Sequence, residues 1–247
     1  MFDLEVLLFI TLIFLFAGFV KGVSGIGLPA VSLSLLTMIM GLKFAVALVV
    51  MPGLLTNVWQ AIGKTRIILI IQRLWPLVLT MFCFSLIGSS LLIKHSYYLT
   101  ILLGCLLILY GSISVFLKKQ YFIPKKYEKL LGFISGSFGG FFGGSTGTFV
   151  FPIALYIYSL NMTKDEFLQT IAFVLITASF CLGFSLTVSN LWSFSLAIYS
   201  FYAVIPSIIG MYIGRKVQSN LEEGIFRKIF LFMIILVGFL IVIRSLS

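Results

Sequence analysis

The sequence predicts an all-α polytopic membrane protein of 8–10 transmembrane segments, built as two inverted-topology repeats with Gly-rich broken or re-entrant helices. Three observations lead to this prediction. The chain of 247 residues is 61% hydrophobic and only 10% charged, whereas soluble domains are about a quarter charged. Its apolar residues form long continuous runs, and two of the turns between these runs are rich in glycine.

Ten apolar runs follow one another along the chain. A helix needs about 20 residues to cross the hydrocarbon core of a bilayer, and most of the runs are long enough. Three shorter runs flank the Gly-rich turns, so we expect broken or re-entrant helices there. The short runs are 28–41, 130–142 and 147–160, and the others lie near 4–22, 44–62, 74–93, 97–117, 166–188, 194–214 and 225–245.

The positive charges predict the orientation in the membrane. If all ten runs cross, fourteen of the 17 Lys and Arg residues fall in loops on one side, and such an excess marks the cytoplasmic side. We therefore expect a multi-pass protein of the cell (plasma or inner) membrane with its N-terminus and C-terminus outside. Asp3 and Glu5 precede the first apolar run, and acids in this place argue against a cleaved signal peptide.

A basic stretch, "KKQYFIPKKYEK" (118–129), divides the chain into two halves of five runs each. We interpret 1–117 as a first membrane repeat, 118–129 as a cytoplasmic linker and 130–247 as a second membrane repeat. Because each half has an odd number of runs, the second half starts on the opposite side of the membrane from the first. The two repeats are therefore expected to be inverted, as in many transporters.

The two halves also share an order of motifs. Gly18-xxx-Gly22 matches Gly132-xxx-Gly136, and each pair leads to more glycines and then to a proline. Later, "FSLIGSS" (84–90) matches "PSIIGMY" (206–212). An internal repeat explains this order. The alternative is that small residues recur wherever membrane helices pack closely.

The short runs place both Gly-rich turns within the membrane. A run of 14 residues forms about 21 Å of helix, against about 30 Å of hydrocarbon. The turns at 22–27 and 139–147 are thus expected near the middle of the bilayer, approached from opposite faces. Irregular backbone at that depth must be buried in protein or line a wet cavity.

The reactive side chains exclude several classes of function. All seven acidic residues lie at a terminus or in a loop, and His95 lies at the end of a run. The runs thus contain no acid–base pair for catalysis, so we expect no enzyme activity and no catalytic residue. The three cysteines lack metal-site spacing, and no metal or other cofactor is expected. The basic residues do not alternate with exposed aromatics, so a nucleic-acid partner is excluded.

The groups that remain are backbone N–H groups, hydroxyls, amides and one lysine. Helices that restart after a Gly turn present unpaired N–H groups and a positive dipole end, which attract anions. The alternatives are that the glycines serve helix packing, that Asn57 and Gln60 bond to neighbouring helices, and that Lys21 snorkels to the interface. The candidate substrate-binding residues are Lys21, Gly22, Ser24, Gly25, Gly27, Asn57, Gln60, Gly139, Gly140, Gly143, Gly144, Ser145, Thr146 and Thr148.

Four segments carry a resemblance to a known family: "FVKGVSGIGLPAV", "GSFGGFFGGSTGTFVFP", "PGLLTNVWQA" and "PSIIGMYIGRKV". With these segments, the chain resembles the sulfite exporter TauE/SafE family over essentially its whole length. The resemblance implies a plasma-membrane permease that moves small sulfur-containing or organic anions, often outward. The first turn, "SGIGLPA", departs from the family pattern because a longer run of glycines is expected there.

These inferences together predict a membrane permease for a small anion. The substrate class is sulfite, an organosulfonate or a related sulfur-containing or organic anion, exported by alternating access around the Gly-rich turns. The alternatives are an anion channel or facilitator and a non-transporting structural membrane subunit. The expected partners are the small anionic substrate and the lipid bilayer, and a homo-oligomer is a further option.

Overall fold

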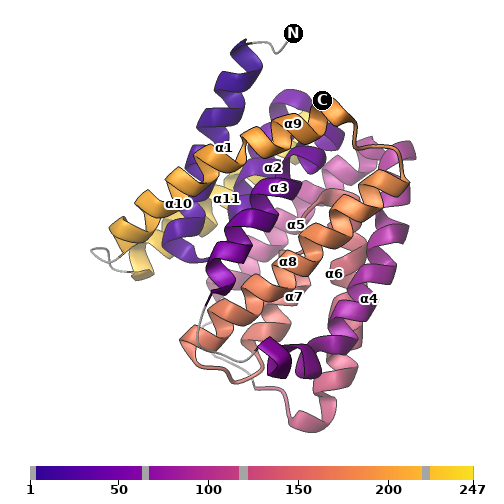
Figure 1. Ribbon diagram of the computed structural model, residues 1–247, viewed down its shortest axis with the longest axis vertical. Helices are drawn as coiled ribbons and strands as arrows, with labels where there is room; N and C mark the ends of the chain where they lie inside the picture. Colours follow the sequence, from indigo (N-terminus) through magenta and orange to yellow (C-terminus); the bar gives the residue numbers. More distant parts are fainter. Residues whose placement is uncertain (1–3, 63–66, 117–121, 219–222, 247) are drawn as a thin grey trace.

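The computed structural model describes residues 4–62, 67–116, 122–218 and 223–246, and within these ranges the chain forms helices and no strand. Eleven helices pack into one bundle, from which the N-terminal half of α1 projects (Figure 1). Six of the helical segments are long and apolar enough to cross a membrane. The prediction of an all-α membrane protein is therefore confirmed.

The helices follow the predicted runs closely. In the first half they are α1 (Leu4–Ser24), α2 (Leu28–Met40), α3 (Leu42–Ala61), α4 (Ile67–Lys94) and α5 (Ser96–Phe116). In the second half they are α6 (Lys125–Thr146), α7 (Val150–Tyr158), α8 (Lys164–Val188), α9 (Phe194–Tyr202), α10 (Val204–Gln218) and α11 (Glu223–Leu246).

Three boundaries differ most from the prediction, and one of them is the start of α4, which lies at Ile67, before the predicted run 74–93. The run 194–214 is divided at Ala203, because Pro206 has no N–H to donate to the carbonyl four residues earlier. Helix α6 begins at Lys125, inside the predicted linker, and continues to Thr146. The expected turn at 139–147 is therefore wrong, since the helix ends only at Gly147.

Helix α6 remains regular through its glycines because they let it lie directly on α4. A Cβ atom on Gly136, Gly140 or Gly144 would overlap backbone atoms of Leu77, Met81 or Ser85, respectively. Each glycine costs about 1 kcal/mol relative to alanine in a helix. Close backbone contact offsets this cost, and the intrahelical hydrogen bonds are kept.

Helices α1 and α10 form a second seam of the same kind. A Cβ atom on Gly18 would overlap the Ser207 carbonyl, and one on Gly210 would overlap the Leu15 carbonyl. The other extensive helix pairs are α3 with α8 and α5 with α11. The helix-packing explanation of the glycines thus holds for both seams.

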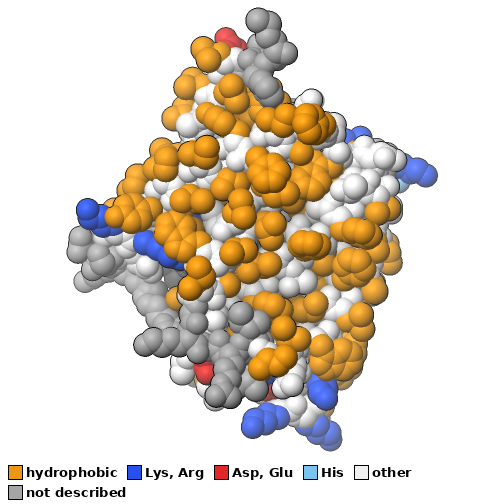
Figure 2. Space-filling view, viewed as in Figure 1, with side chains coloured by type: hydrophobic (Ala, Val, Ile, Leu, Met, Phe, Trp, Pro, Cys, Tyr) orange, Lys and Arg blue, Asp and Glu red, His pale blue; other side chains and the backbone are white. Residues whose placement is uncertain are grey.

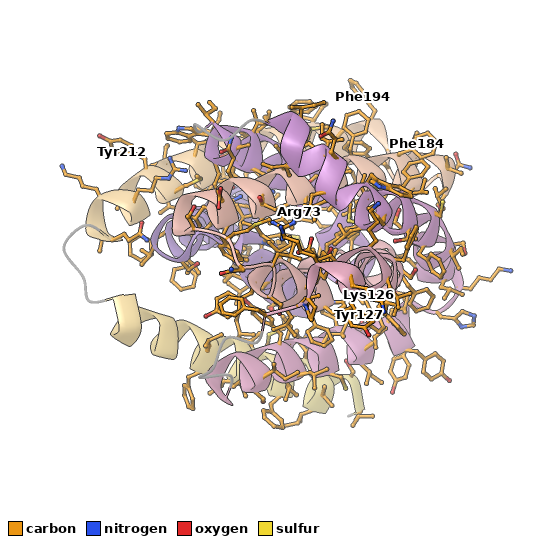
Figure 3. The ribbon with its side chains drawn as sticks, turned by 90° about the horizontal axis from the view of Figure 1, so that it is seen from below. Arg73, Lys126, Tyr127, Phe184, Phe194 and Tyr212 are labelled. Atoms are coloured by element: carbon orange, nitrogen blue, oxygen red, sulfur yellow. The ribbon has the colours of Figure 1, made fainter. Side chains whose placement is uncertain are left out.

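One end of the bundle gathers the ends of α1, α3, α7 and α10 and the starts of α4, α6 and α8; we call it the linker face. Four contacts join these helix ends: Arg73 with Glu128, Tyr158 with Phe167, Gly25 with Leu168 and Trp59 with Arg215. Arg73 lies near the middle of this end of the bundle, whereas Phe184, Phe194 and Tyr212 point outward at the periphery (Figure 3).

The side of the bundle is apolar. Hydrophobic side chains cover most of the surface that faces the viewer in Figure 2, and Lys and Arg gather at its edges. Large apolar side chains stand exposed, such as Phe180 with 70% and Phe194 with 82% of its surface accessible. A lipid environment explains such exposure, because these side chains would be costly in water.

Candidate functional site

A small buried cavity lies between α3 and α8, where the two helix breaks also arrive. Its volume is about 20 Å³, which is room for about one water molecule. Helices α3 and α8 supply most of the wall, and the residues after each break complete it. The lining residues are Pro29, Val49, Val50, Gly53, Asn57, Gly147, Phe149, Leu175, Ala178, Ser179 and Leu182.

The first break lies between α1 and α2. Gly25 and Gly27 have φ angles of +77° and +124°, which side chains of L-residues rarely adopt. The Ser24 hydroxyl closes the turn by donating to the carbonyl oxygens of Val20 (2.8 Å) and Ile26. Helix α2 then starts with a proline in its first turn and without a side-chain cap. Its first N–H groups therefore have no side-chain partner, and Pro29, which lines the cavity, has no N–H to offer.

The second break lies between α6 and α7. Gly147 ends α6 in the left-handed conformation (φ +80°), and its N–H donates to the Gly143 carbonyl at 2.8 Å. Helix α7 also starts without a side-chain cap. A Cβ atom on Gly147 would lie 3.1 Å from the side chains of Leu33 and Val46. The second break therefore packs against α2 and α3, next to the start of the first half's broken helix.

Asn57 and Lys21 form the polar end of the site. Lys21 is only 2% exposed, and its Nζ donates to Thr56 Oγ1 at 3.0 Å and to Asn57 Oδ1. Lys21 is thus directed into the bundle towards α3, and the snorkelling alternative is not what the structure adopts. Asn57 also lines the cavity, so its side chain lies between the Lys21 ammonium and the cavity.

Gln60 lies one helical turn beyond Asn57, close to the first break. Its Nε2 donates to the Leu168 carbonyl at 3.5 Å, which links α3 to the start of α8. Its Oε1 is buried and has no hydrogen-bond partner among the described residues. Both amides thus contact a neighbouring helix, as the packing alternative predicts, and substrate contact stays a prediction.

Several predicted site residues face helix seams instead of the cavity. Gly22 faces α10, Gly140 and Gly144 face α4, and Gly139 and Gly143 face Ile153 and Phe149 near the start of α7. The hydroxyls of Ser145 and Thr146 donate to carbonyls of their own helix at 2.8 and 2.7 Å. Thr148 is buried in the second break, where its N–H donates to Thr146 Oγ1 at 3.4 Å.

The structure adds residues that the sequence interpretation did not select. Ser179 of α8 and Gly53 of α3 are neighbours in the wall of the cavity, since a Cβ atom on Gly53 would lie 3.1 Å from Ser179 Oγ. Gly147 and Thr56 are the other additions. Ser179 is a small polar residue in the middle of a predicted membrane run, and this is the signal that could have selected it.

The described side chains include no group of three His, Cys, Asp or Glu that could hold a metal ion. The polar side chains that line the cavity are Asn57 and Ser179, whose hydroxyl donates to the Leu175 carbonyl at 2.9 Å, and the Lys21 ammonium lies beyond Asn57.

Comparison with known proteins agrees with this architecture. The family model described as sulfite exporter TauE/SafE matches residues 10–241, which is nearly the whole chain. Neither the curated proteins nor the solved structures contain a match. The resemblance that the four sequence motifs suggested is therefore confirmed by a match across both halves. The chain belongs to the sulfite exporter TauE/SafE family, a family of membrane transporters for sulfur-containing anions.

Proposed function

We propose that this protein is a permease that exports a small sulfur-containing oxyanion, such as sulfite or an organosulfonate, by alternating access. The observation that carries the proposal is the convergence of two helix breaks and Asn57 on one buried cavity. Non-helical backbone within a membrane bundle is characteristic of transporter substrate sites.

The anion is held in this proposal by groups that donate hydrogen bonds. The uncapped start of α2 offers a positive dipole end. Ser179 and Asn57 contribute a hydroxyl and an amide from opposite walls. Lys21 supplies the positive charge that balances the substrate.

Helix contacts support the proposed inverted repeat. We pair α1 with α6, α2 with α7, α3 with α8, α4 with α10 and α5 with α11. Exchange of the halves then converts the α1–α10 seam into the α6–α4 seam, and the α3–α8 and α5–α11 pairs each map onto themselves. The cavity lies between α3 and α8, so the proposed symmetry axis passes close to it.

The seam contacts favour a particular register for the repeat. Gly18 packs on Ser207 as Gly144 packs on Ser85, and Gly210 packs on Leu15 as Gly88 packs on Phe141. These contacts agree with the sequence match of 84–90 with 206–212. They pair Gly18 with Gly144, however, where the sequence alignment had paired it with Gly132. Lys21 then corresponds to Gly147, so the ammonium belongs to the first half alone.

In our proposal the protein is a carrier whose cavity enlarges to admit the substrate. A volume of about 20 Å³ accepts a water molecule but no sulfur oxyanion. In our proposal the halves move relative to each other to admit the substrate, as alternating access requires.

The test is flux in proteoliposomes that contain the purified protein. The anions are sulfite, sulfate, sulfonates and carboxylates, each with and without a pH gradient. We expect flux of sulfite or a sulfonate. If no anion moves, the transport proposal is wrong, and a structural membrane subunit becomes the better interpretation.

Two variants connect the flux to the cavity. Asn57→Asp keeps the shape of the side chain and offers Lys21 a carboxylate partner, so we expect a folded protein that excludes anions. Ser179→Ala should slow flux, whereas Ser207→Ala should not. Both serines donate to carbonyls of their own helices, at 2.9 and 2.7 Å, but only Ser179 lines the cavity. Equal flux in both serine variants would remove the cavity from the mechanism.

A further inference from the structure

The ammonium of Lys21 is a buried positive charge that has only neutral partners among the described side chains. It donates to Thr56 Oγ1 and Asn57 Oδ1. The Thr56 hydroxyl in turn donates to the Pro52 carbonyl at 2.5 Å, so towards Lys21 it acts as an acceptor. A cation in a membrane interior is costly unless a negative group balances it.

The carboxylates that the structure describes are engaged elsewhere. Glu128 forms a bidentate ion pair with Arg73, and Glu166 accepts a hydrogen bond from the Thr163 N–H at 2.9 Å. Glu5 lies in the first turn of α1, about 24 Å of helix away from Lys21. No described acidic side chain thus neutralises this ammonium.

A second cation stands next to Lys21. Gly22 touches α10 at Arg215, since a Cβ atom on Gly22 would lie 2.9 Å from the Arg215 backbone nitrogen. The Arg215 guanidinium lies over the ring of Trp59 on α3, with Cζ 5.1 Å from the ring centroid. Two cations that repel each other become more stable when an anion lies between them.

We propose that Arg215 and Lys21 form an anion-capture site at the linker face, which takes the substrate from the aqueous phase and delivers it to Asn57. This inference rests on the proposed transport function. Arg215 is partly exposed at the end of α10, whereas Lys21 is buried, so the two residues lead inward from the surface. A guanidinium binds the oxygens of a sulfonate or sulfite in a bidentate manner while it remains stacked on an aromatic ring.

The site is one-sided. In the register given by the glycine seams, Lys21 corresponds to Gly147, and Arg215 corresponds to Ile93. The two positions related to this pair by the proposed symmetry thus carry no charge. The proposed symmetry therefore gives two pathways to the cavity, of which only the linker-face pathway has the cations. We expect the transporter to bind its anion more tightly from this face.

The experiment measures sulfite or methanesulfonate flux in proteoliposomes of known orientation. Arg215→Gln should raise KM at the linker face at least about tenfold, since a charge-assisted hydrogen bond is lost. KM at the opposite face and kcat should change little. Lys216→Gln is the matched control, because it removes the same charge from the next residue, and it should change KM less than about twofold.

A direct readout does not depend on the arginine variant being folded. In a Trp75→Phe, Trp192→Phe background, Trp59 is the remaining tryptophan, and its fluorescence should change on titration with methanesulfonate. Equal KM values for Arg215→Gln and Lys216→Gln, or an unchanged Trp59 signal while flux persists, would overturn the capture site and leave the transport proposal intact. No flux in the unmodified protein would overturn both.

Discussion

Ser200 of α9 donates a hydrogen bond to the Leu48 carbonyl of α3 at 2.9 Å, and its oxygen accepts the Met51 N–H at 3.1 Å. Pro52 is the reason that this carbonyl is available. A proline four residues after Leu48 has no N–H to donate, so the carbonyl loses its helical partner. Such a group in a membrane needs another donor, and Ser200 supplies it from a distant part of the chain. The bond supports α3 about two turns before Thr56 and Asn57.

Ser200→Ala should therefore destabilise the protein by about 1–3 kcal/mol, because it leaves a buried carbonyl without a donor. Thermal unfolding in detergent measures the effect. Ser137→Ala is the control, since its hydroxyl donates to the Phe133 carbonyl of its own helix at 2.8 Å. Similar losses of stability in the two variants would show that the hydrogen bond from Ser200 to the Leu48 carbonyl does not compensate for the N–H that Pro52 lacks.

A comparison of alanine variants at Gly147 and Gly41 distinguishes the effect of backbone strain from the effect of a side chain near the cavity. Gly147 is in the left-handed region (φ +80°, ψ −2°), and Gly41 (φ +82°, ψ 161°) is in a region that is essentially restricted to glycine, so backbone strain alone would harm an alanine at Gly41 at least as much as one at Gly147. A Cβ atom on Gly41 meets nothing within 4 Å, whereas one on Gly147 meets Leu33 and Val46. We expect Gly41→Ala to retain transport and Gly147→Ala to lose most of it. Comparable flux in both variants, measured per folded protein, would contradict a role of the second break.

The α4–α6 seam should tolerate no side chain. Gly144→Ala would force α6 away from the Ser85 backbone, so we expect a loss of several kcal/mol and little folded protein. Gly183→Ala is the comparison, because the nearest atoms to its Cβ belong to the side chains of Val50 (3.2 Å) and Trp192 (3.3 Å) and not to a backbone. Size-exclusion profiles of the detergent-solubilised variants distinguish the two. A monodisperse Gly144→Ala protein that transports normally would rule out the tight seam.

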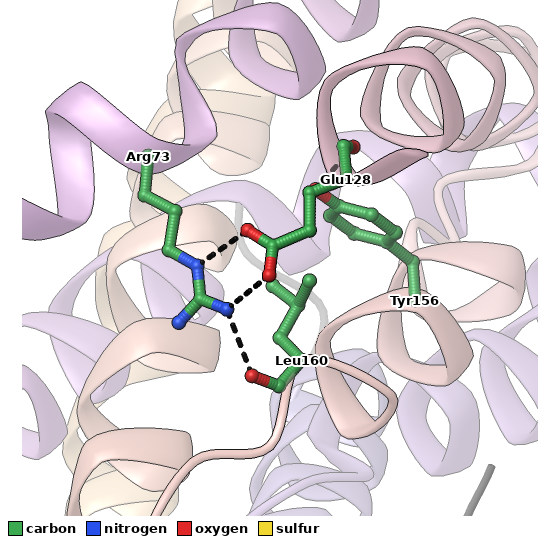
Figure 4. A network of polar contacts seen from close by, with 4 residues as sticks. All are labelled: Arg73, Glu128, Tyr156 and Leu160. Carbon is green, nitrogen blue, oxygen red and sulfur yellow. Dashed lines mark hydrogen bonds and ion pairs between the residues drawn. The ribbon is translucent and has the colours of Figure 1, made fainter. Parts of the chain in front are cut away.

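The ion pair of Arg73 and Glu128 fastens α4 to α6 at the linker face (Figure 4). Arg73 also donates to the Leu160 carbonyl at 2.8 Å, and Tyr156 donates to the Glu128 carbonyl at 2.9 Å. These two hydrogen bonds connect the end of α7 to the same ion pair. Arg73 is 33% exposed, which weakens the pair through solvent screening. A double-mutant cycle with Arg73→Gln and Glu128→Gln should give a coupling of about 1 kcal/mol that falls with added salt. Zero coupling at low salt would show that the pair does not fasten the helices.

The class of protein and the position of its helices could be read from the sequence because both follow from local hydropathy. A run such as 166–188 can bury its backbone polar groups in lipid only as a helix, and α8 covers it. The first break was also predictable, since Gly25, Gly27 and Pro29 together disfavour a continuous helix.

The second break was misplaced because glycine has two uses that look alike in a sequence. Gly140 and Gly144 could end a helix or let two helices touch, and only the presence of α4 decides between these uses. The same holds for Lys21, whose side chain could reach the interface or the interior. Thr56 and Asn57 of α3, which lie within reach, determine that it turns inward.

The sequence by itself determined that this chain is a bundle of membrane helices with a broken helix in its first half. These properties depend on residues that are near one another along the chain, through hydropathy and backbone freedom. The tertiary structure alone decided which glycines form seams, where the second break lies, and which polar residues meet at the cavity between α3 and α8. Those outcomes depend on contacts between segments that are far apart in the sequence, because the partner that makes a glycine or a lysine favourable lies on another helix.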